Sequence, residues 1–216
     1  MEIQPIPLAI FARFYEARRP QQVTIVRDAR LFQSDPKGYA GRDYYRGLRN
    51  TLRKTHCETE DITIFESALG PLISQQTNET KRDHYQQVGA AYIAYWRDND
   101  ARFFGGIPDA RVDLAGLQIR VSTEVGMIRH GDHWALKLWL NAPRPTLGFR
   151  QAVRYLTEQG RRQGGWHQDW QASIWDVRRK EILPEARVPK DLALALEGQA
   201  GAFQGIWRKL DTEEEE

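Results

Sequence analysis

The stretch Leu117–Leu140, LQIRVSTEVGMIRHGDHWALKLWL, decides the fold. Apolar and polar residues alternate along Leu117–Met127, and a second alternating run follows at Trp134–Leu140. A period of two is typical of β-strands that bury one face. The dipeptide Gly131-Asp132 lies between the runs and suits a two-residue turn. The sequence therefore predicts a β-hairpin with one apolar face.

A turn at Gly131-Asp132 pairs Gly126 with Lys137 and brings the apolar faces of both strands together. In this register Glu124 and Lys137 are diagonal neighbours on the opposite face, with Gly126 leaving room above the backbone. A carboxylate beside an ammonium can bind a divalent cation and position an attacking water. It can equally be a structural ion pair worth about 0–1 kcal/mol. Spacing alone favours the ion pair.

Helical periodicity dominates before residue 105 and strand periodicity after it. Three amphipathic helices are predicted before residue 72, and Gln21–Phe32, whose pattern also suits a strand, is assigned to a helix. A further helix, capped by Asp83, carries an aromatic stripe from Tyr85 to Trp96 that suits a core. After the hairpin, a helix capped by Thr146 precedes strands at 172–177 and 182–183, and another helix follows.

This order predicts an α/β (α+β) fold in which helices cover a sheet. We expect a helical region over residues 1–80 and an α/β core with C-terminal helices over 81–216, either separate or as one continuous domain. The last six residues hold five acids, which we expect to form a solvated tail. Residues 1–210 then hold 31 basic and 24 acidic residues, a net charge of +7 that would attract nucleic acid.

Composition excludes several classes of protein. With 41% hydrophobic residues the chain is not disordered, and the single Cys57 excludes an internal disulfide and a multi-thiolate zinc site. Neither a run of about 18 apolar residues nor an N-terminal leader is found, which predicts a cytoplasmic protein without a membrane partner. P-loop, dinucleotide-binding and nucleophile-elbow motifs are missing from the sequence.

Three segments resemble a family of uncharacterised bacterial proteins: LQIRVSTEVGM at Leu117–Met127, WALKLWL at Trp134–Leu140 and IWDVRRKEIL at Ile174–Leu183. In that family a V-x-P-E-L-G-L segment is followed by V-I-K-L-Y-F and later by L-D-V-R-R-G-K-L. The similarity runs from Tyr85 to Trp207, and more loosely includes DYYRGLR at Asp43–Arg49. The resemblance implies a PD-(D/E)XK nuclease-like core with the order helix-strand-strand-strand-helix-strand.

Active members of that nuclease class hold Mg²⁺ with an acid on the second strand and an acid-x-Lys pair on the third. By resemblance, Glu124 matches the first acid and metal ligand, and Lys137 matches the lysine that steadies the phosphate or the attacking water. Ala135 stands where the second acid belongs. One carboxylate seldom holds Mg²⁺, so the resemblance predicts a degenerate nuclease whose metal-dependent phosphodiesterase activity is weak or lost.

A basic rim would complete a nucleic-acid site beside Glu124. Gln151 and Tyr155 have the Q-x-x-x-Y spacing of a substrate-contact motif in some such nucleases, although an ordinary helix surface also explains them. The further rim residues expected to meet substrate are Arg144, Arg150, Arg154, Arg178 and Arg179. Solubilising charge at exposed turns is the alternative for these arginines.

The runner-up hypothesis is a non-catalytic protein-interaction subunit of a larger bacterial assembly. Large aromatic side chains supply much of the energy at protein interfaces. The tryptophans that would serve such an interface, or equally the core, are Trp166, Trp170, Trp175 and Trp207. The sequence leaves the choice between DNA, RNA and protein partners open, together with the oligomeric state.

Overall fold

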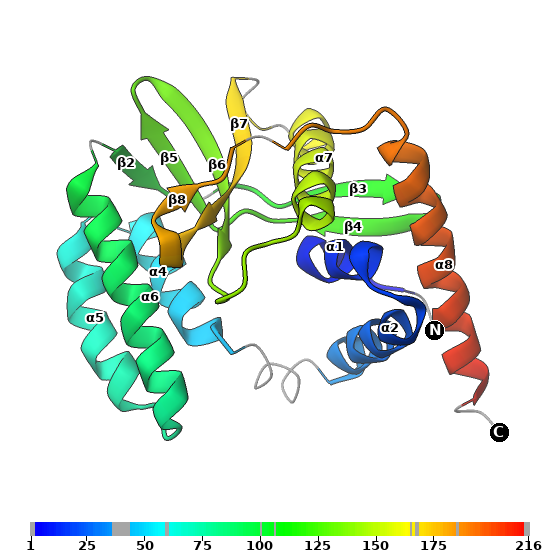
Figure 1. The fold of residues 1–216 in the computed structure, drawn as a ribbon, viewed down its shortest axis with the longest axis horizontal. Coiled ribbons are helices and arrows are strands. Elements are labelled where there is room, and N and C mark those ends of the chain that lie inside the picture. The colour runs from blue at the N-terminus through cyan, green and yellow to red at the C-terminus, as the bar shows by residue number, and fades with distance from the viewer. Residues whose placement is uncertain are drawn as a thin grey trace.

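The computed structural model describes residues 3–35, 44–58, 61–99, 101–105, 107–164, 166, 169–184 and 186–213. Two sheets with helices packed around them give an α+β fold, as predicted (Figure 1). None of the helices in these ranges is long and apolar enough to cross a membrane.

The larger sheet has the strand order β2-β5-β6-β7-β8. Its neighbours are antiparallel except β6 and β7, which are parallel and joined by the crossover helix α7. Thr146 caps α7 as predicted, because its side chain accepts a hydrogen bond from Phe149 N–H. The bounds are β2 Ala101–Phe104, β5 Val125–Arg129, β6 Asp132–Trp139, α7 Leu147–Gln163, β7 Trp170–Asp176 and β8 Glu181–Ile182.

The prediction of one strand over Leu117–Met127 is wrong. The chain leaves one sheet at Ser122–Glu124: β4 (Leu117–Val121) pairs with β1 (Ile6–Pro7) and β3 (Ala110–Leu114) in a smaller sheet, whereas β5 belongs to the larger one. Alternation continues across the break because apolar residues of the same parity enter two different cores. Periodicity therefore could not reveal it.

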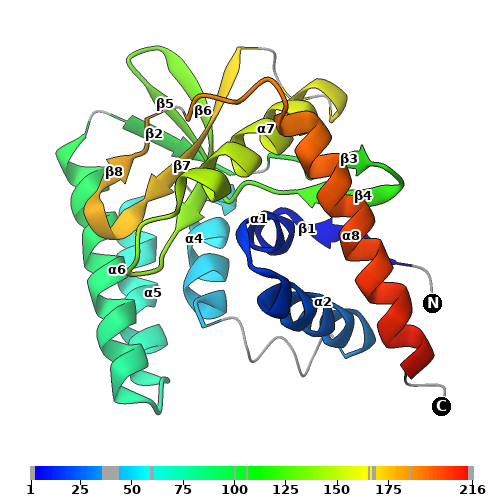
Figure 2. The same cartoon turned by 45° about the vertical axis from the view of Figure 1, so that its right-hand side comes forward.

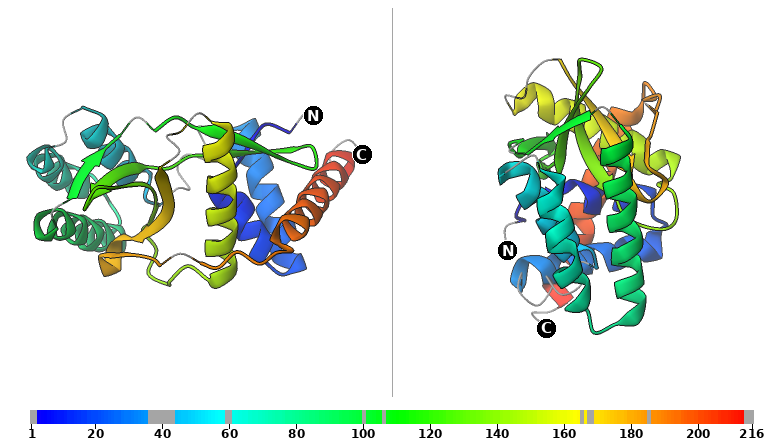
Figure 3. Two further views of the ribbon diagram at one scale, coloured as in Figure 1. Left: turned by 90° about the horizontal axis from the view of Figure 1, so that it is seen from above. Right: turned by 90° about the vertical axis from the view of Figure 1, so that its left-hand side faces the viewer.

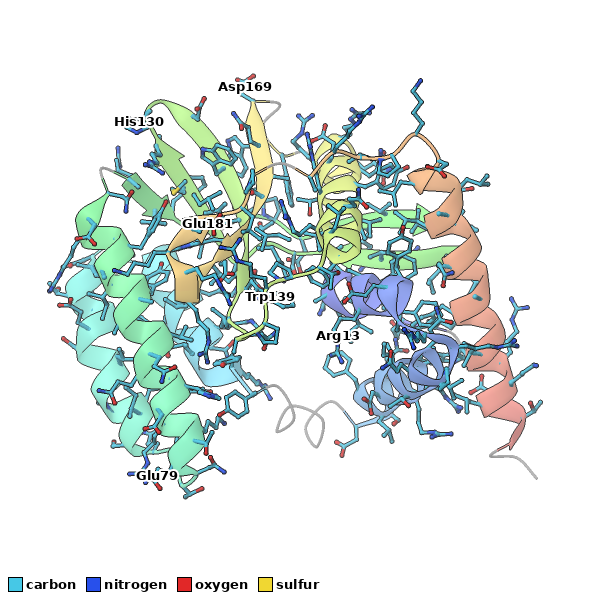
Figure 4. All side chains as sticks on the ribbon, viewed as in Figure 1. Arg13, Glu79, His130, Trp139, Asp169 and Glu181 are labelled. Carbon is cyan, nitrogen blue, oxygen red and sulfur yellow. The ribbon has the colours of Figure 1, made fainter. Side chains whose placement is uncertain are left out.

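The predicted hairpin turn is also wrong by one residue on each strand. The turn residues are His130 and Gly131, with φ of 53° and 85°, and His130 lies at the tip of the hairpin (Figure 4). Positive φ at both positions is what a two-residue type I′ turn requires. Gly126 consequently pairs with Ala135 rather than with Lys137.

The space expected above Gly126 is filled. A Cβ atom at this position would lie 2.2 Å from Cε2 of Phe104, so the ring of the neighbouring strand β2 packs directly on the glycine. Gly126 thus serves strand packing and leaves no room for a ligand.

In the described residues before position 75 the three predicted amphipathic helices are present, and the ambiguous Gln21–Phe32 segment is helical, as assigned, and forms most of α2. Asp61 caps α5 by accepting a hydrogen bond from Thr63 N–H. The N-cap of α6 is Asn78, four residues after the end of α5, and not the expected Asp83. Asn78 is the capping residue because its side chain accepts a hydrogen bond from Lys81 N–H at 2.9 Å. The bounds are α1 Leu8–Glu16, α2 Arg19–Ser34, α4 Arg46–Glu58, α5 Ile62–Ser74, α6 Glu79–Asp98 and α8 Leu192–Glu213.

Two hydrophobic cores hold the chain together, and each joins residues from both sides of position 80. The first core packs α1, α2, α7 and α8 around the smaller sheet, and the second packs α4, α5 and α6 on the larger sheet (Figure 2). α7 lies at the middle of the molecule, between the larger sheet and α8 (Figure 3). Within the acidic C-terminal segment, Asp211 belongs to α8 and pairs with Arg30 of α2 at 2.7 Å.

Candidate functional site

Glu124 and Lys137 meet where the two sheets join. Lys137 Nζ donates to Glu124 Oε1 at 2.7 Å and to the carbonyl oxygen of Ser122 at 3.3 Å. Glu124 Oε2 accepts from Leu138 N–H at 3.0 Å. The two side chains are only 8% and 14% exposed. Both carboxylate oxygens are therefore engaged within the protein.

The break between β4 and β5 creates this geometry. Glu124 N–H still donates to the carbonyl oxygen of Leu136 at 3.1 Å, which extends the β5–β6 pairing by one residue. Glu124 accordingly faces Lys137 directly rather than diagonally. The sequence prediction that these two side chains share one face holds, although it was reached through the wrong register.

Arg49 of α4 brings a second cation to the same carboxylate. Its Nε lies 3.9 Å from Glu124 Oε1, and its side chain is 28% exposed. The cluster of Arg49, Lys137 and Glu124 thus holds two positive charges and one negative charge. Arg49 therefore connects α4 to the Glu124–Lys137 pair at a partly solvent-accessible position.

The residues around this pair do not fit Mg²⁺, which takes six oxygen ligands in near-octahedral geometry. Ala135, at the position of the second acid, is apolar and 1% exposed. Among the described residues, no three His, Cys, Asp or Glu side chains come together. Two further acids have partners of their own: Asp109 pairs with Arg120, and Asp113 accepts a hydrogen bond from Gly116 N–H.

The residues of α7 expected to form the rim contact the segment that follows β8. Arg150 donates to the carbonyl oxygen of Pro184 and Arg154 to that of Ala186, while Gln151 Nε2 donates to Arg187. Two further residues expected at the rim are Arg144, which pairs with Glu181 at 2.7 Å, and Tyr155, which packs half-buried on the first core. These contacts fix the return path of the chain over α7.

Arg178 and Arg179 form hydrogen bonds with the loop that follows β6. Arg178 Nε donates to the carbonyl oxygen of Leu140, and its two terminal nitrogens donate to Tyr45 Oη and Gln87 Oε1. Arg179 donates to the carbonyl oxygen of Ala142 and pairs with Asp176. Arg178 therefore ties the loop to α6 and to the residue that precedes α4.

Asp176, the partner of Arg179, is fully buried and was not singled out from the sequence. One of its oxygens lies 2.8 Å from Arg179, and the other has no hydrogen-bond partner in the described part of the chain. The signal was present, because an acid ends β7 two residues before the three consecutive cations Arg178, Arg179 and Lys180. A buried acid at that point orients the basic turn.

The basic face of α4 was also missed. Arg46, Arg49 and Arg53 recur at helical spacing beside Lys54, and residues 46–57 include no acid. Arg46, Arg53 and Lys54 are exposed, while Arg49 reaches Glu124. Charge patterning could have identified this face, but the helix was considered only for its apolar residues. The basic face of α4 leads from solvent to the Glu124–Lys137 pair.

Comparisons of the chain with family models, curated proteins and solved structures returned no match. The function is therefore argued from the site alone.

Proposed function

We propose that this chain is a nucleic-acid-binding protein on a nuclease-like core whose hydrolytic centre is replaced by an ion pair. The order α6, β2, β5, β6, α7, β7 supports the core, with β2, β5 and β6 antiparallel and β7 parallel to β6. Strands β3 and β4 are inserted between β2 and β5. Glu124 and Lys137 then occupy the acid and lysine positions of such a core.

The observation that carries the proposal is one carboxylate held between two cations with both of its oxygens engaged. Glu124 accepts from Lys137 and from a backbone N–H, so a metal ion would have to displace both donors. Arg49 belongs to the basic face of α4, which continues into the exposed Arg46 and Arg53. Arginines at helical spacing suit successive phosphates of a nucleic-acid backbone.

Salt dependence of binding tests this proposal. The affinity for a fluorescent DNA or RNA fragment should fall steeply as salt rises, because bound cations release counterions from the phosphates. The double variant Arg46→Ala with Arg53→Ala should reduce the slope of log affinity against log salt by about 2. Arg208→Ala with Lys209→Ala removes the same charge from α8, on the other side of the molecule (Figures 1 and 2), and should leave the slope unchanged. An affinity indifferent to salt contradicts the proposal.

A cleavage assay tests the loss of hydrolysis. With Mg²⁺ or Mn²⁺, DNA and RNA should stay intact at enzyme concentrations that saturate binding, in the wild type as in Glu124→Gln and Lys137→Met. Metal-dependent cleavage by the wild type that both substitutions abolish would assign an active nuclease instead.

A shallow groove between α5 and α6 favours a second candidate, the protein-interaction subunit. Ala90, Ile93 and Ala94 form its apolar floor, and Glu66 and Arg97 lie on its charged rim, paired at 2.5 Å. An amphipathic helix of a partner would suit such a surface. The tryptophans considered for an interface contribute little, since Trp166, Trp175 and Trp207 are buried. A stoichiometric protein partner that Ile93→Asp releases, without nucleic acid, would favour this candidate.

A further inference from the structure

Tyr44 is the only exposed aromatic residue in the described part of the chain, with 37% of its surface accessible. It lies in the turn immediately before α4, two residues from Arg46 at the start of the basic face of that helix. The other described Phe, Tyr and Trp side chains are all buried or partly buried.

The Tyr44 ring is held in place by neighbours on α6. Its hydroxyl is hydrogen-bonded to His84 Nδ1 at 2.9 Å, and the ring meets that of Tyr45 at 4.9 Å in an edge-on arrangement. Tyr45 in turn stacks on the buried Tyr85 at 6.0 Å. A ring fixed before binding loses little conformational freedom when a ligand stacks on it.

Cations surround this ring. Lys81 Nζ lies over the rings of Tyr44 and Tyr85, 5.6 Å and 5.3 Å from their centroids. Arg178 donates to the hydroxyl of Tyr45 at 2.7 Å. A fixed aromatic ring beside a cation such as Lys81 is the combination that binds single-stranded nucleic acid, in which each base offers a face for stacking and each phosphate a charge.

We propose that single-stranded nucleic acid is the ligand, with an unpaired base stacked on Tyr44 and the adjoining phosphates on Lys81 and the basic face of α4. The inference rests on the proposed nucleic-acid binding and limits the ligand to single strands. The ammonium of Lys81 moves from the ring face to a phosphate when the base arrives. A duplex keeps its bases stacked inside, so it uses the cations but not the ring.

Equilibrium binding to two probes tests the inference. One probe is a fluorescent oligothymidylate of about 12 nucleotides, and the other is a duplex of similar length. Tyr44→Ala should weaken binding of the oligothymidylate about 5- to 150-fold and leave duplex binding unchanged. Tyr44→Phe, which keeps the ring and loses the bond to His84, should stay within about threefold of the wild type, since the ring carries the stacking. Leu194→Ala, at an exposed apolar site on α8, is the control and should change neither affinity.

The outcomes separate the two proposals. If the wild type binds neither the oligothymidylate nor the duplex at low salt, the proposal of nucleic-acid binding is overturned altogether. Normal salt-dependent binding with no difference between Tyr44→Ala and the wild type overturns only the stacking role. Equal weakening by Tyr44→Ala and Tyr44→Phe also overturns it, because the hydroxyl rather than the ring would then matter. Circular dichroism of each variant establishes that it is folded.

Discussion

The ammonium of Lys137 lies 2.7 Å from Glu124 Oε1, at the point where the chain passes from the smaller sheet to the larger one. Both side chains are largely withdrawn from water, and the remaining donor to Glu124 is a backbone N–H. The pair therefore closes the junction between the sheets, next to the basic face of α4 on which the proposed ligand would bind.

Removing one member of this pair should destabilise the fold. Lys137→Met leaves a desolvated carboxylate with fewer donors and should lower the free energy of unfolding by about 3 kcal/mol in urea titrations. Arg162→Met breaks a pair in which Arg162 is 64% exposed and should cost less than about 0.5 kcal/mol. A Lys137→Met loss no larger than that of the control would show that Glu124 is not desolvated.

Gly126 should tolerate no side chain while Phe104 is present. The methyl group of Gly126→Ala meets the Phe104 ring at 2.2 Å and should cost about 1–3 kcal/mol of stability. Against a Phe104→Ala background the same substitution should cost less than about 0.5 kcal/mol, since the clash is gone. Equal costs in the two backgrounds, measured by denaturant titration, would contradict this packing.

Two glycine substitutions should act in opposite directions. Gly131→Ala forces a side chain into the left-handed region, at φ of 85°, and should cost about 1–2 kcal/mol. Gly198 lies in α8 with no atom near the position of a Cβ, so Gly198→Ala should add about 0.8 kcal/mol. Thermal unfolding of both variants measures the signs. A Gly131→Ala protein more stable than the wild type would show that Gly131 is not at a turn position with positive φ.

Arg178→Lys separates a structural role from a ligand contact. Lysine cannot reproduce the three directed hydrogen bonds to Leu140, Tyr45 and Gln87, so stability should fall by about 2 kcal/mol. The affinity of the folded variant for nucleic acid should remain unchanged at matched salt. Weaker binding with full stability would instead assign Arg178 to the substrate rim that the resemblance implies.

Local sequence signals predicted the elements well and their partners poorly. The period of two located β6 and the stretch that holds β4 and β5, although not the break between them, and the apolar spacing located the helices, because each element buries a face of its own. The turn at His130-Gly131 was misplaced since histidine at positive φ is uncommon. The prediction that Glu124 and Lys137 share a face was still correct, because a shift of one residue on both strands leaves each side chain on the same face of the hairpin.

The surroundings of the pair depend on contacts across long stretches of sequence. Nothing near residue 124 indicates that Arg49 approaches from α4, or that the arginines of α7 bond backbone carbonyls at 184–186. Such partners are set by how the layers pack, which a periodicity does not encode. Charge counts identify cations but not which of them solvent reaches.

The first core has a consequence for the order of folding. It begins with Ile6 in β1 and is closed by Phe203, Trp207 and Leu210 in α8, while the residues between contribute to both cores in turn. Contacts so distant in sequence make nucleation slow. During synthesis the first core therefore cannot be completed before α8 has emerged, and the apolar side chain of Ile6 lacks those core partners until then.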